Sequence, residues 1–485
     1  MRRLIINKVL TPLAPCGWKR FCAAFLVCLV LTAAAPSQTF TNLITLNGAN
    51  GEFPAASLIQ GIDGNFYGTT LKGGAYNGGT VFKITPKGKL TTLYSFCANP
   101  GANCPDGSNP GGLVLATNGM FYGTTQYGGT TGLGAGTIFE ITPAGKLKTL
   151  YSFCSQANCA DGEEPEGPLV QGTNGKLYGT TALSGSNGDP TSVIFEITLS
   201  GAFTVLSTAP TDTFLNGPLI QASNGDFYTS GGNFSTYEDG AIFKITPTGS
   251  LSALLAFDDA DGNGPNGALL QGPNGDLYGT TSTAPGTVYY GTVYQLTLGG
   301  ALTMIHGFAG GAGGGDPTTG VILGTDGNFY GTSAGGTGSF CSAVCGIIYQ
   351  LTAGGTLTPL YNFCSQSGCT DGLDPNGLLQ GTDGNFYGTT FGGPGVDGTV
   401  FKLSVGLGPF VKTLPTSGVV GEEIGILGNN LNGTTAVSFN GTAATFKVYS
   451  NTLILTSVPS GATTGTVTVT TPSGTLSSNV AFRVR

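Results

Sequence analysis

Three oxygen-bearing side chains in one short loop have the spacing of calcium ligands. Asp259, Asp261 and Asn263 alternate within the segment 258–264, which reads Asp-Asp-Ala-Asp-Gly-Asn-Gly. An EF-hand-like loop would also need a bidentate Glu near position 270, where this chain has Leu270. Asp and Gly also favour ordinary tight turns. We therefore keep two interpretations of this loop, a calcium site and a plain Asp-Gly turn, and no other cofactor is indicated.

Eight cysteines lie beyond residue 37, in four pairs of close neighbours along the chain. The pairs are Cys97 with Cys104, Cys154 with Cys159, Cys341 with Cys345, and Cys364 with Cys369. Such an even, local pairing indicates disulfides formed outside the cytoplasm, each closed within one loop. Zinc is the disfavoured alternative, because the pairs lie in different repeats and no His accompanies them.

Two further motifs resemble catalytic ones without their partners. Residues 331–335 match Gly-x-Ser-x-Gly, but Ser333 stands where another repeat has Thr70, and a Gly loop follows instead of the required helix. His306 is the only His, and it stands in its repeat at the position that Tyr94 occupies in the first repeat. We interpret His306 as a packing residue rather than a general base, and we predict no catalytic residue.

A cluster of carboxylates leaves one enzymatic alternative open. Glu163, Glu164 and Glu166 lie close together in a segment between repeats. Paired carboxylates can hydrolyse glycosides without a His. The same cluster is equally consistent with a solvated loop, so both interpretations stand.

These residues are carried by a phrase that recurs seven times, an aromatic residue or Leu followed by Tyr and usually Gly-Thr-Thr. The tyrosines recur every 50 to 57 residues, at Tyr67, Tyr122, Tyr178, Tyr228, Tyr278, Tyr330 and Tyr387. A fixed period of this size indicates a repeat architecture. Seven equivalent tyrosines suggest packing between repeats, with sugar stacking in a central channel as the alternative.

Each repeat reads as four short strands. In the first repeat these are 57–60, 65–70, 80–85 and 89–96, separated by turn residues and rich in Thr, aromatic or β-branched residues. We expect Asp63-Gly64 to form a two-residue hairpin turn. No repeat shows a sustained helical period.

The two ends of the array predict a closed ring. The last repeat stops at its third strand, 398–404, whereas the segment 40–46 aligns with the fourth strands of the other repeats. Pairing 40–46 with 399–404 would complete the seventh unit and remove an exposed edge. The predicted fold is all-β, with a seven-bladed β-propeller over residues 38–406.

The connections between strands differ in length and variability. The turns within the first and last hairpins of each repeat are short and nearly constant. The connections between the second and third strands, and between repeats, are long, variable and hold all four cysteine pairs. These long connections emerge on one side of an antiparallel unit, so we expect a binding surface there.

The first 37 residues have the pattern of a secretion signal. Five of the 18 basic residues lie there, all before the short apolar run 21–34, whereas all 26 acidic residues follow. The remaining chain is acidic and its repeats contain no Arg, which argues against nucleic acid as a partner. No later segment predicts a transmembrane helix. We expect a secreted or cell-surface protein.

The phrases at 64–70, 79–85 and 90–96, in tandem, resemble the GloVer repeat family of secreted bacterial proteins, over roughly residues 40–404. The resemblance implies an exported or surface-displayed repeat protein and supplies no catalytic residues. The pattern changes after the repeats, with Pro-Thr-Ser-Gly at 415–418, Val-Ser-Phe-Asn-Gly at 437–441 and Gly-Thr-Val-Thr-Val at 465–469. On these phrases the segment 407–485 resembles an IPT/TIG immunoglobulin-like domain, which implies a small β-sandwich.

The functional expectation that follows is a non-enzymatic, monomeric binding protein. Its ligand would be a protein or a polysaccharide held on the side of the long connections. The alternatives are an extracellular carbohydrate-active enzyme that uses loop carboxylates and a purely structural component of the cell envelope.

Overall fold

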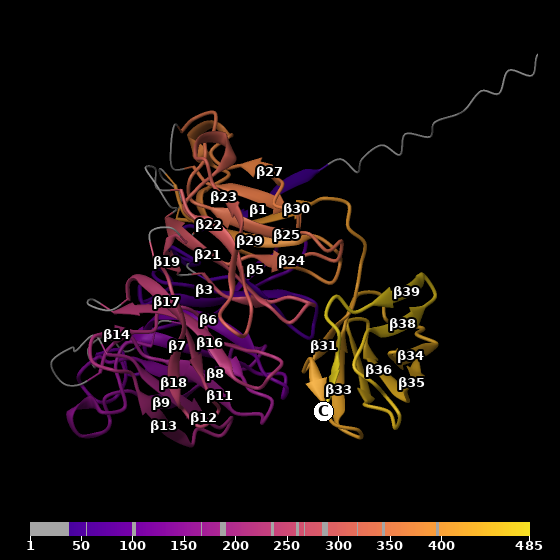
Figure 1. The fold of residues 1–485 in the computed structure, drawn as a ribbon, viewed down its shortest axis with the longest axis horizontal. Coiled ribbons are helices and arrows are strands. Elements are labelled where there is room, and N and C mark those ends of the chain that lie inside the picture. The colour runs from indigo at the N-terminus through magenta and orange to yellow at the C-terminus, as the bar shows by residue number, and fades with distance from the viewer. Residues whose placement is uncertain are drawn as a thin grey trace, which may run out of the picture. The chain divides into compact units, whose positions relative to one another are not determined.

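The computed structural model describes residues 38–485 except 55, 99–102, 166, 185–190, 234–236, 259–260, 266, 284–289, 318, 342–344 and 394–396. The predicted signal sequence therefore lies outside the described residues. Residues 38–485 form one compact unit, built from small antiparallel sheets (Figure 1). The described residues contain no α-helix, and three short 3-10 turns are η2 (Ala157–Cys159), η3 (Gly311–Gly313) and η4 (Ser367–Cys369).

The seven repeats form seven sheets, numbered here I to VII along the chain. Sheet I holds β2 (Ile59–Gln60), β3 (Phe66–Thr70), β4 (Thr80–Ile84) and β5 (Leu90–Ser95). Sheet II holds β6 (Ser108–Leu115), β7 (Phe121–Tyr127), β8 (Thr137–Ile141) and β9 (Leu147–Ser152). Sheet III holds β10 (Val170–Gln171), β11 (Leu177–Thr180), β12 (Val193–Ile197) and β13 (Phe203–Thr208).

In sheets IV and V the first strand is split into two short pieces. Sheet IV holds β14 (Thr213–Phe214), β15 (Ile220–Gln221), β16 (Phe227–Asn233), β17 (Tyr237–Ile245) and β18 (Leu251–Ala256). Sheet V holds β19 (Asn263–Pro265), β20 (Leu270–Gln271), β21 (Leu277–Thr283), β22 (Thr292–Leu296) and β23 (Leu302–Gly307). Sheet VI holds β24 (Ile322–Leu323), β25 (Phe329–Ser333), β26 (Ile347–Leu351) and β27 (Leu357–Asn362). Sheet VII holds β28 (Leu373–Gln380), β29 (Phe386–Gly392), β30 (Thr399–Ser404) and β1 (Thr39–Thr45).

The N-terminal strand completes the last sheet, as the sequence predicts. Strand β1 pairs antiparallel with β30, from Thr39 opposite Ser404 to Thr45 opposite Thr399, with one register shift between Asn42 and Ile44. The predicted pairing of 40–46 with 399–404 is therefore confirmed. Strand β30 thereby has a partner on both edges, β29 and β1.

The first hairpin turn differs from the two-residue turn that we expected. Gly61 N donates to Asn65 O at 2.9 Å, so three residues lie between the paired positions. Only Gly64 adopts a positive φ, 76°, whereas Asp63 caps the turn by accepting from Asn65 N at 3.1 Å. Three-residue hairpins commonly end in such a left-handed glycine.

The Phe-Tyr phrase packs each sheet against the next. The ring of Tyr67 lies 4.1 Å from that of Phe121, and the ring of Tyr387 lies 3.9 Å from that of Phe66, which joins the last sheet to the first. The tyrosine side chains are buried. Apolar clusters join sheets I with II, VI with VII and VII with I in the same way. The interpretation of these tyrosines as packing residues is therefore confirmed.

Glutamines at the ends of first strands form a second set of links between sheets. Gln171 accepts from Thr117 N at 2.9 Å, and Gln60 accepts from Thr382 N at 3.0 Å. In the same way, backbone N–H groups of the preceding sheet donate to the side-chain oxygens of Gln221, Gln271 and Gln380.

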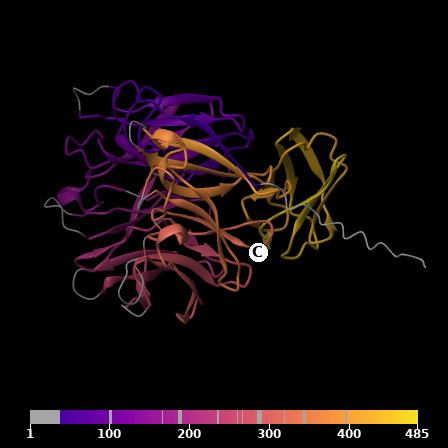
Figure 2. The same cartoon turned by 90° about the horizontal axis from the view of Figure 1, so that it is seen from above.

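The C-terminal strands form their own sheets. One contains β31 (Lys412–Leu414), β33 (Glu423–Leu427), β37 (Leu453–Ser457) and β36 (Phe446–Ser450). Another contains β35 (Thr442–Ala443), β34 (Ala436–Phe439), β38 (Val467–Thr471) and β39 (Gly474–Ser477), and β32 (Ser417–Gly418) pairs in parallel with β40 (Arg483–Val484). Their alternating apolar residues enclose a separate core that includes Ile426, Phe439 and Val469. These strands are yellow in Figure 2.

Polar contacts fix the C-terminal strands to the repeats. Lys412 Nζ donates to Gln380 O at 2.6 Å, and Thr452 Oγ1 donates to Ile62 O at 2.8 Å. Asn429 Nδ2 donates to Thr382 Oγ1 at 2.7 Å. Within the described part of the chain, no helix has the length and apolar character needed to cross a membrane.

Candidate functional site: the loop face

The long connections of all seven sheets gather on one side, which we call the loop face. It comprises the connections between the second and third strands, the connections between consecutive sheets, and the strand ends beside them. Antiparallel order places these connections at one end of each sheet and the short turns at the other, which we call the turn face. Backbone bonds join loop-face connections of consecutive sheets, such as Asp316 N to Tyr290 O at 2.8 Å and Glu164 N to Ala135 O at 2.8 Å.

Four disulfides close connections of the loop face. They join Cys97 to Cys104, Cys154 to Cys159, Cys341 to Cys345, and Cys364 to Cys369. These are the four pairs that the sequence predicts, and each bridge stays within one connection. Cys345, Cys364 and Cys369 are buried together, so two bridges of sheets VI and VII share one small core.

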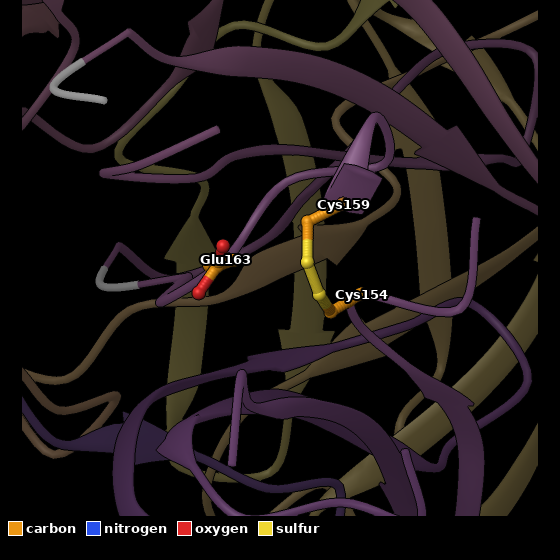
Figure 3. Close-up of side chains that lie close together, drawn as sticks. All are labelled: Cys154, Cys159 and Glu163. Atoms are coloured by element: carbon orange, nitrogen blue, oxygen red, sulfur yellow. A yellow bond between two sulfur atoms is a disulfide. The ribbon is translucent and has the colours of Figure 1, made fainter. Parts of the chain in front are cut away.

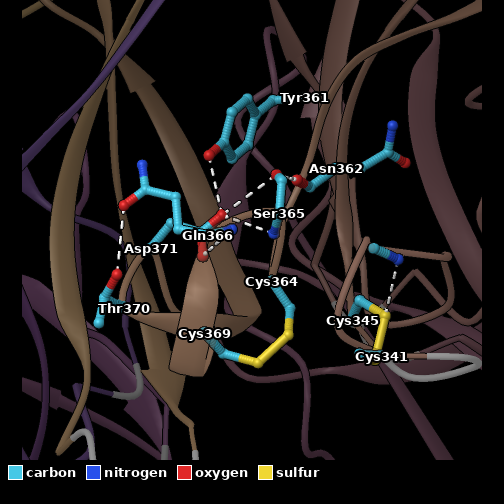
Figure 4. The surroundings of a disulfide bond; sticks show 11 residues. Cys341, Cys345, Tyr361, Asn362, Cys364, Ser365, Gln366, Cys369, Thr370 and Asp371 are labelled. Atoms are coloured by element: carbon cyan, nitrogen blue, oxygen red, sulfur yellow. Dashed lines mark hydrogen bonds between the residues drawn. A yellow bond between two sulfur atoms is a disulfide. The ribbon is translucent and has the colours of Figure 1, made fainter.

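Two of these disulfide loops are each organised by a buried aspartate of their own. Asp371 is fully buried and accepts from Tyr361 Oη at 2.8 Å and from the backbone N of Ser365 at 3.0 Å and Gln366 at 3.3 Å (Figure 4). A carboxylate with several donors can stay buried because its oxygens remain hydrogen-bonded. The motif holds the loop against its own sheet.

The same arrangement recurs one disulfide earlier in the chain. Asp161 is fully buried and accepts from Tyr151 Oη at 2.7 Å and Ser155 N at 2.9 Å. Burial raises the pKa of Tyr151 to about 12, and its bond to Asp161 acts in the same direction. The tyrosine partner, ten residues away, was not anticipated.

Cys154, Cys159 and Glu163 form a group with the spacing of metal ligands. Their sulfur and oxygen atoms lie within 4.8 Å of one another (Figure 3). The two sulfurs are bonded to each other, whereas a metal-binding cysteine must be a thiolate. The group is therefore a disulfide beside a carboxylate.

The carboxylates considered for catalysis fall into small groups on the loop face. Burial raises the pKa of Glu163, with further contributions from the neighbouring Glu164 and Asp161. Glu164 accepts from Gln126 Nε2 at 3.3 Å, and Glu166 lies outside the described residues. Burial, followed by the nearby Asp316 carboxylate, also raises the pKa of Asp374.

The calcium candidate is described only in part, because Asp259 lies outside the described residues. Asp261 N donates to Asp258 Oδ1 at 3.1 Å, which is the geometry of a capped turn. The side-chain amide of Asn263 donates to Asp239 Oδ1. Burial and the neighbouring Asp258 raise the pKa of Asp261. Calcium binding here stays a prediction.

The two residues that resembled catalytic groups have structural partners. Ser333 is buried at the end of β25 and donates to Gly335 O at 3.1 Å. The His306 ring packs edge-on against Phe308 at 5.3 Å, and its Nδ1 lies 3.0 Å from Gly355 O. His306 fits the packing interpretation, and Ser333 fits a structural position equivalent to that of Thr70.

Exposed apolar side chains on the loop face were not predicted from the sequence. Five of the large ones lie in connections between second and third strands or at the adjoining strand ends: Tyr76, Tyr127, Leu133, Phe340 and Phe391. Long, variable connections were the only available signal, because nothing local distinguishes an exposed ring from a buried one.

This combination of repeated sheets and one variable face defines a β-propeller-like repeat protein. A model of the Gloeobacter/Verrucomicrobia repeat family matches residues 30–158, 101–283 and 215–449. The chain therefore belongs to that family. No curated protein matches the sequence.

Solved structures resemble the chain at low sequence identity. A fungal alcohol oxidase of the AA5 family, in complex with copper, is 14% identical with a TM-score of 0.54, over 92% of this chain and 98% of that chain. An oligogalacturonate lyase in complex with manganese is 12% identical with a TM-score of 0.47, over 75% of this chain and 92% of that chain. The likeness to the alcohol oxidase concerns the fold alone.

Proposed function

We propose that this chain is exported, folds as a seven-bladed β-propeller followed by an IPT/TIG immunoglobulin-like domain, and binds an extracellular macromolecule on its loop face without chemical turnover. The pairing of β1 with β30 and the packing of sheet VII on sheet I support ring closure. The predicted leader and four disulfides support export. The ligand class is a protein or a polysaccharide.

One observation carries the binding function. The loop face displays exposed rings on connections that are fixed at their backbones. The connection of Phe340 contains the Cys341–Cys345 disulfide, and those of Tyr76 and Tyr127 bond to neighbouring connections, through Asn109 N to Gly78 O at 3.0 Å and Gly129 N to Cys104 O at 2.9 Å. Phe340 is 57% exposed, yet its backbone N donates to Cys364 O at 3.2 Å beside a disulfide. Aromatic side chains have few rotatable bonds, and a connection whose backbone is already held in place loses little further conformational entropy on binding, which favours recognition.

A second candidate is an extracellular carbohydrate-active enzyme. Its support is the raised pKa of Glu163 and of Asp374, since a general acid must keep its proton near neutral pH. A structural role in the cell envelope is the third reading, and it requires neither binding nor turnover.

Calorimetric titration of the full chain separates these functions. The probes are neutral, acidic and basic polysaccharides, a lysine/arginine dodecapeptide and a glutamate dodecapeptide, with reducing ends assayed in parallel. The binding function predicts saturable heat with at least one probe and no new reducing ends. Release of reducing ends that Glu163→Gln abolishes would establish the enzyme instead, and no binding to any probe would leave the structural role.

A further inference from the structure

Charge divides the repeats into two unlike faces. Fourteen described acidic residues lie on the loop face: Glu52, Asp106, Asp161, Glu163, Glu164, Asp212, Glu238, Asp239, Asp258, Asp261, Asp316, Asp371, Asp374 and Asp397. Lys72 is the one basic residue among the described residues of that face. The remaining lysines of the repeats lie in the short turns or at the strand ends beside them: Lys83, Lys87, Lys89, Lys146, Lys148, Lys176, Lys244 and Lys402.

The described ion pairs of the repeats lie on the turn side. Three of the seven acidic residues there have cationic partners, Glu196 among them, as in Lys83 with Asp63 at 3.6 Å and Lys244 with Asp226 at 2.9 Å. The other four accept hydrogen bonds from neutral side chains: Glu140, Asp276, Asp326 and Asp383. The pairs Lys176–Glu196 and Arg485–Glu422 also lie away from the loop face. Within the described chain, Glu52, Asp212 and Asp397 form no ion pair and are at least partly exposed, so their charge is available to a partner. Glu163, Asp316 and Asp374 form no ion pair either, but burial raises the pKa of each of these three carboxyls.

Among the described residues, the large exposed apolar side chains of this acidic face lie in one part of it. Tyr76 belongs to sheet I, Tyr127 and Leu133 to sheet II, Phe340 to sheet VI and Phe391 to sheet VII. These four sheets are consecutive, because apolar clusters join VI to VII, VII to I, and I to II. Across the described residues, the large exposed side chains of the loop face therefore follow one continuous arc.

At the centre of the arc, the junction of sheets VII and I brings rings and carboxylates together. Phe53 and Phe391 stack with centroids 5.1 Å apart. A Cβ placed on Gly48 would lie 2.9 Å from Glu52 Oε1 and 3.9 Å from Asp397 Oδ2, so both carboxylates border one small volume. We call Glu52, Phe53, Phe391 and Asp397 the seam cluster.

We propose that the arc binds a lysine- and arginine-rich polypeptide, with the seam cluster as its central contact. This inference rests on the proposed binding function and narrows its ligand. Ammonium and guanidinium groups are attracted both to carboxylates and to aromatic faces. The aliphatic stems of Lys and Arg also cover exposed apolar surface, such as Leu133 and Phe340, while their charged heads stay hydrated.

A basic polysaccharide is the competing ligand, and the side chains favour it less. The only Trp is Trp18, within the predicted leader, so the described face lacks the broad ring that stacks best on a pyranose. Small scattered rings between carboxylates suit separate, flexible cationic side chains better than a stiff sugar chain.

The test is a titration of the full chain with a fluorescent lysine/arginine dodecapeptide at low and physiological salt. We expect saturable binding that weakens as salt rises. Glu52→Gln combined with Asp397→Asn should weaken it about tenfold, because two unpaired carboxylates are lost. Phe391→Ala should weaken it about threefold through the lost ring face.

A charge-matched variant controls for general electrostatic attraction. Asp212→Asn with Glu423→Gln removes the same formal charge elsewhere, and Asn tolerates the positive φ of 61° at position 212. Binding should change less than twofold. Equal losses in both double variants would overturn the seam cluster as the site.

The remaining outcomes separate this inference from the proposed function. Binding of a glucosamine oligomer without binding of the peptide would overturn the polypeptide ligand and leave the binding function intact. Failure of every probe in the calorimetric panel would overturn both. Unchanged melting temperatures of the variants would show that weaker binding does not come from unfolding.

Discussion

Gln60 and Thr382 are 322 positions apart and exchange two hydrogen bonds. Gln60 Nε2 donates to Thr382 Oγ1 at 3.1 Å, and Thr382 N donates to Gln60 Oε1 at 3.0 Å. Both side chains are buried, at 8% and 1% exposed. This pair and the β1–β30 ladder therefore fasten sheet I to sheet VII at two separate places.

The glutamine link should contribute measurably to the stability of the protein. Sheets II and VI carry Leu115 and Leu323 at the same position, so Gln60→Leu is a substitution that the fold accommodates. We expect a loss of about 1–3 kcal/mol in the free energy of unfolding, because buried Thr382 N loses its acceptor. Denaturant titration measures this loss.

Gln171→Leu is the matched control for this substitution. Its partner Thr117 is exposed, so water can replace the lost acceptor and the loss should stay below about 1 kcal/mol. Equal losses in the two variants would contradict a special role for the junction of sheets I and VII.

Removing the N-terminal strand should open that junction. Deleting residues 38–47 leaves β30 as an exposed edge strand, which can pair with other molecules. We expect aggregation, or a large fall in melting temperature, seen by size-exclusion chromatography and thermal unfolding. The control is a chain that begins at Thr39 and therefore keeps the whole of β1. A deletion variant that stays monomeric with an unchanged melting temperature would rule out the closed ring.

The disulfides should stabilise loops rather than the array of sheets. Each bridge closes a short segment, so Cys154→Ser with Cys159→Ser should cost about 2 kcal/mol at most by the chain-entropy argument. We expect the sheets to persist after reduction while protease cleaves the loop face faster. Peptide mapping that found other pairings, or global unfolding under mild reductant, would refute this account.

Much of this architecture could be predicted because its signals are local and repeated. The Phe-Tyr phrase, the paired cysteines and the unpaired strand at 40–46 each appear within a few residues. The glutamine links could not be predicted, since Gln60 gains its role from a residue 322 positions away. The arc of exposed rings was missed for the same reason. Tyr76 and Phe340 come to lie on one surface only when sheets VI, VII and I assemble.

Alkaline pH should weaken the disulfide loops through their tyrosines. Burial raises the pKa of Tyr151 and of Tyr361 to about 12 from an ordinary value of 10.0, with the bonds to Asp161 and Asp371 acting in the same direction. The unfolded chain therefore ionises first as pH rises. The stabilisation is complete below pH 10 and declines between pH 10 and 12.

Urea unfolding across that pH window measures the effect. Tyr151→Phe with Tyr361→Phe should flatten the decline, because the ring stays while the ionising hydroxyl is gone. An equally steep decline in this variant would show that other groups dominate.

The most direct test of the loop face as the binding surface is hydrogen exchange of the full chain with and without the lysine/arginine dodecapeptide. We predict slower exchange at residues 48–54, 71–79, 128–136, 338–341 and 391–393, and no change in the turns at 61–65 and 172–175 or in β31–β40. Protection concentrated at the turn face or in the C-terminal strands would contradict the account.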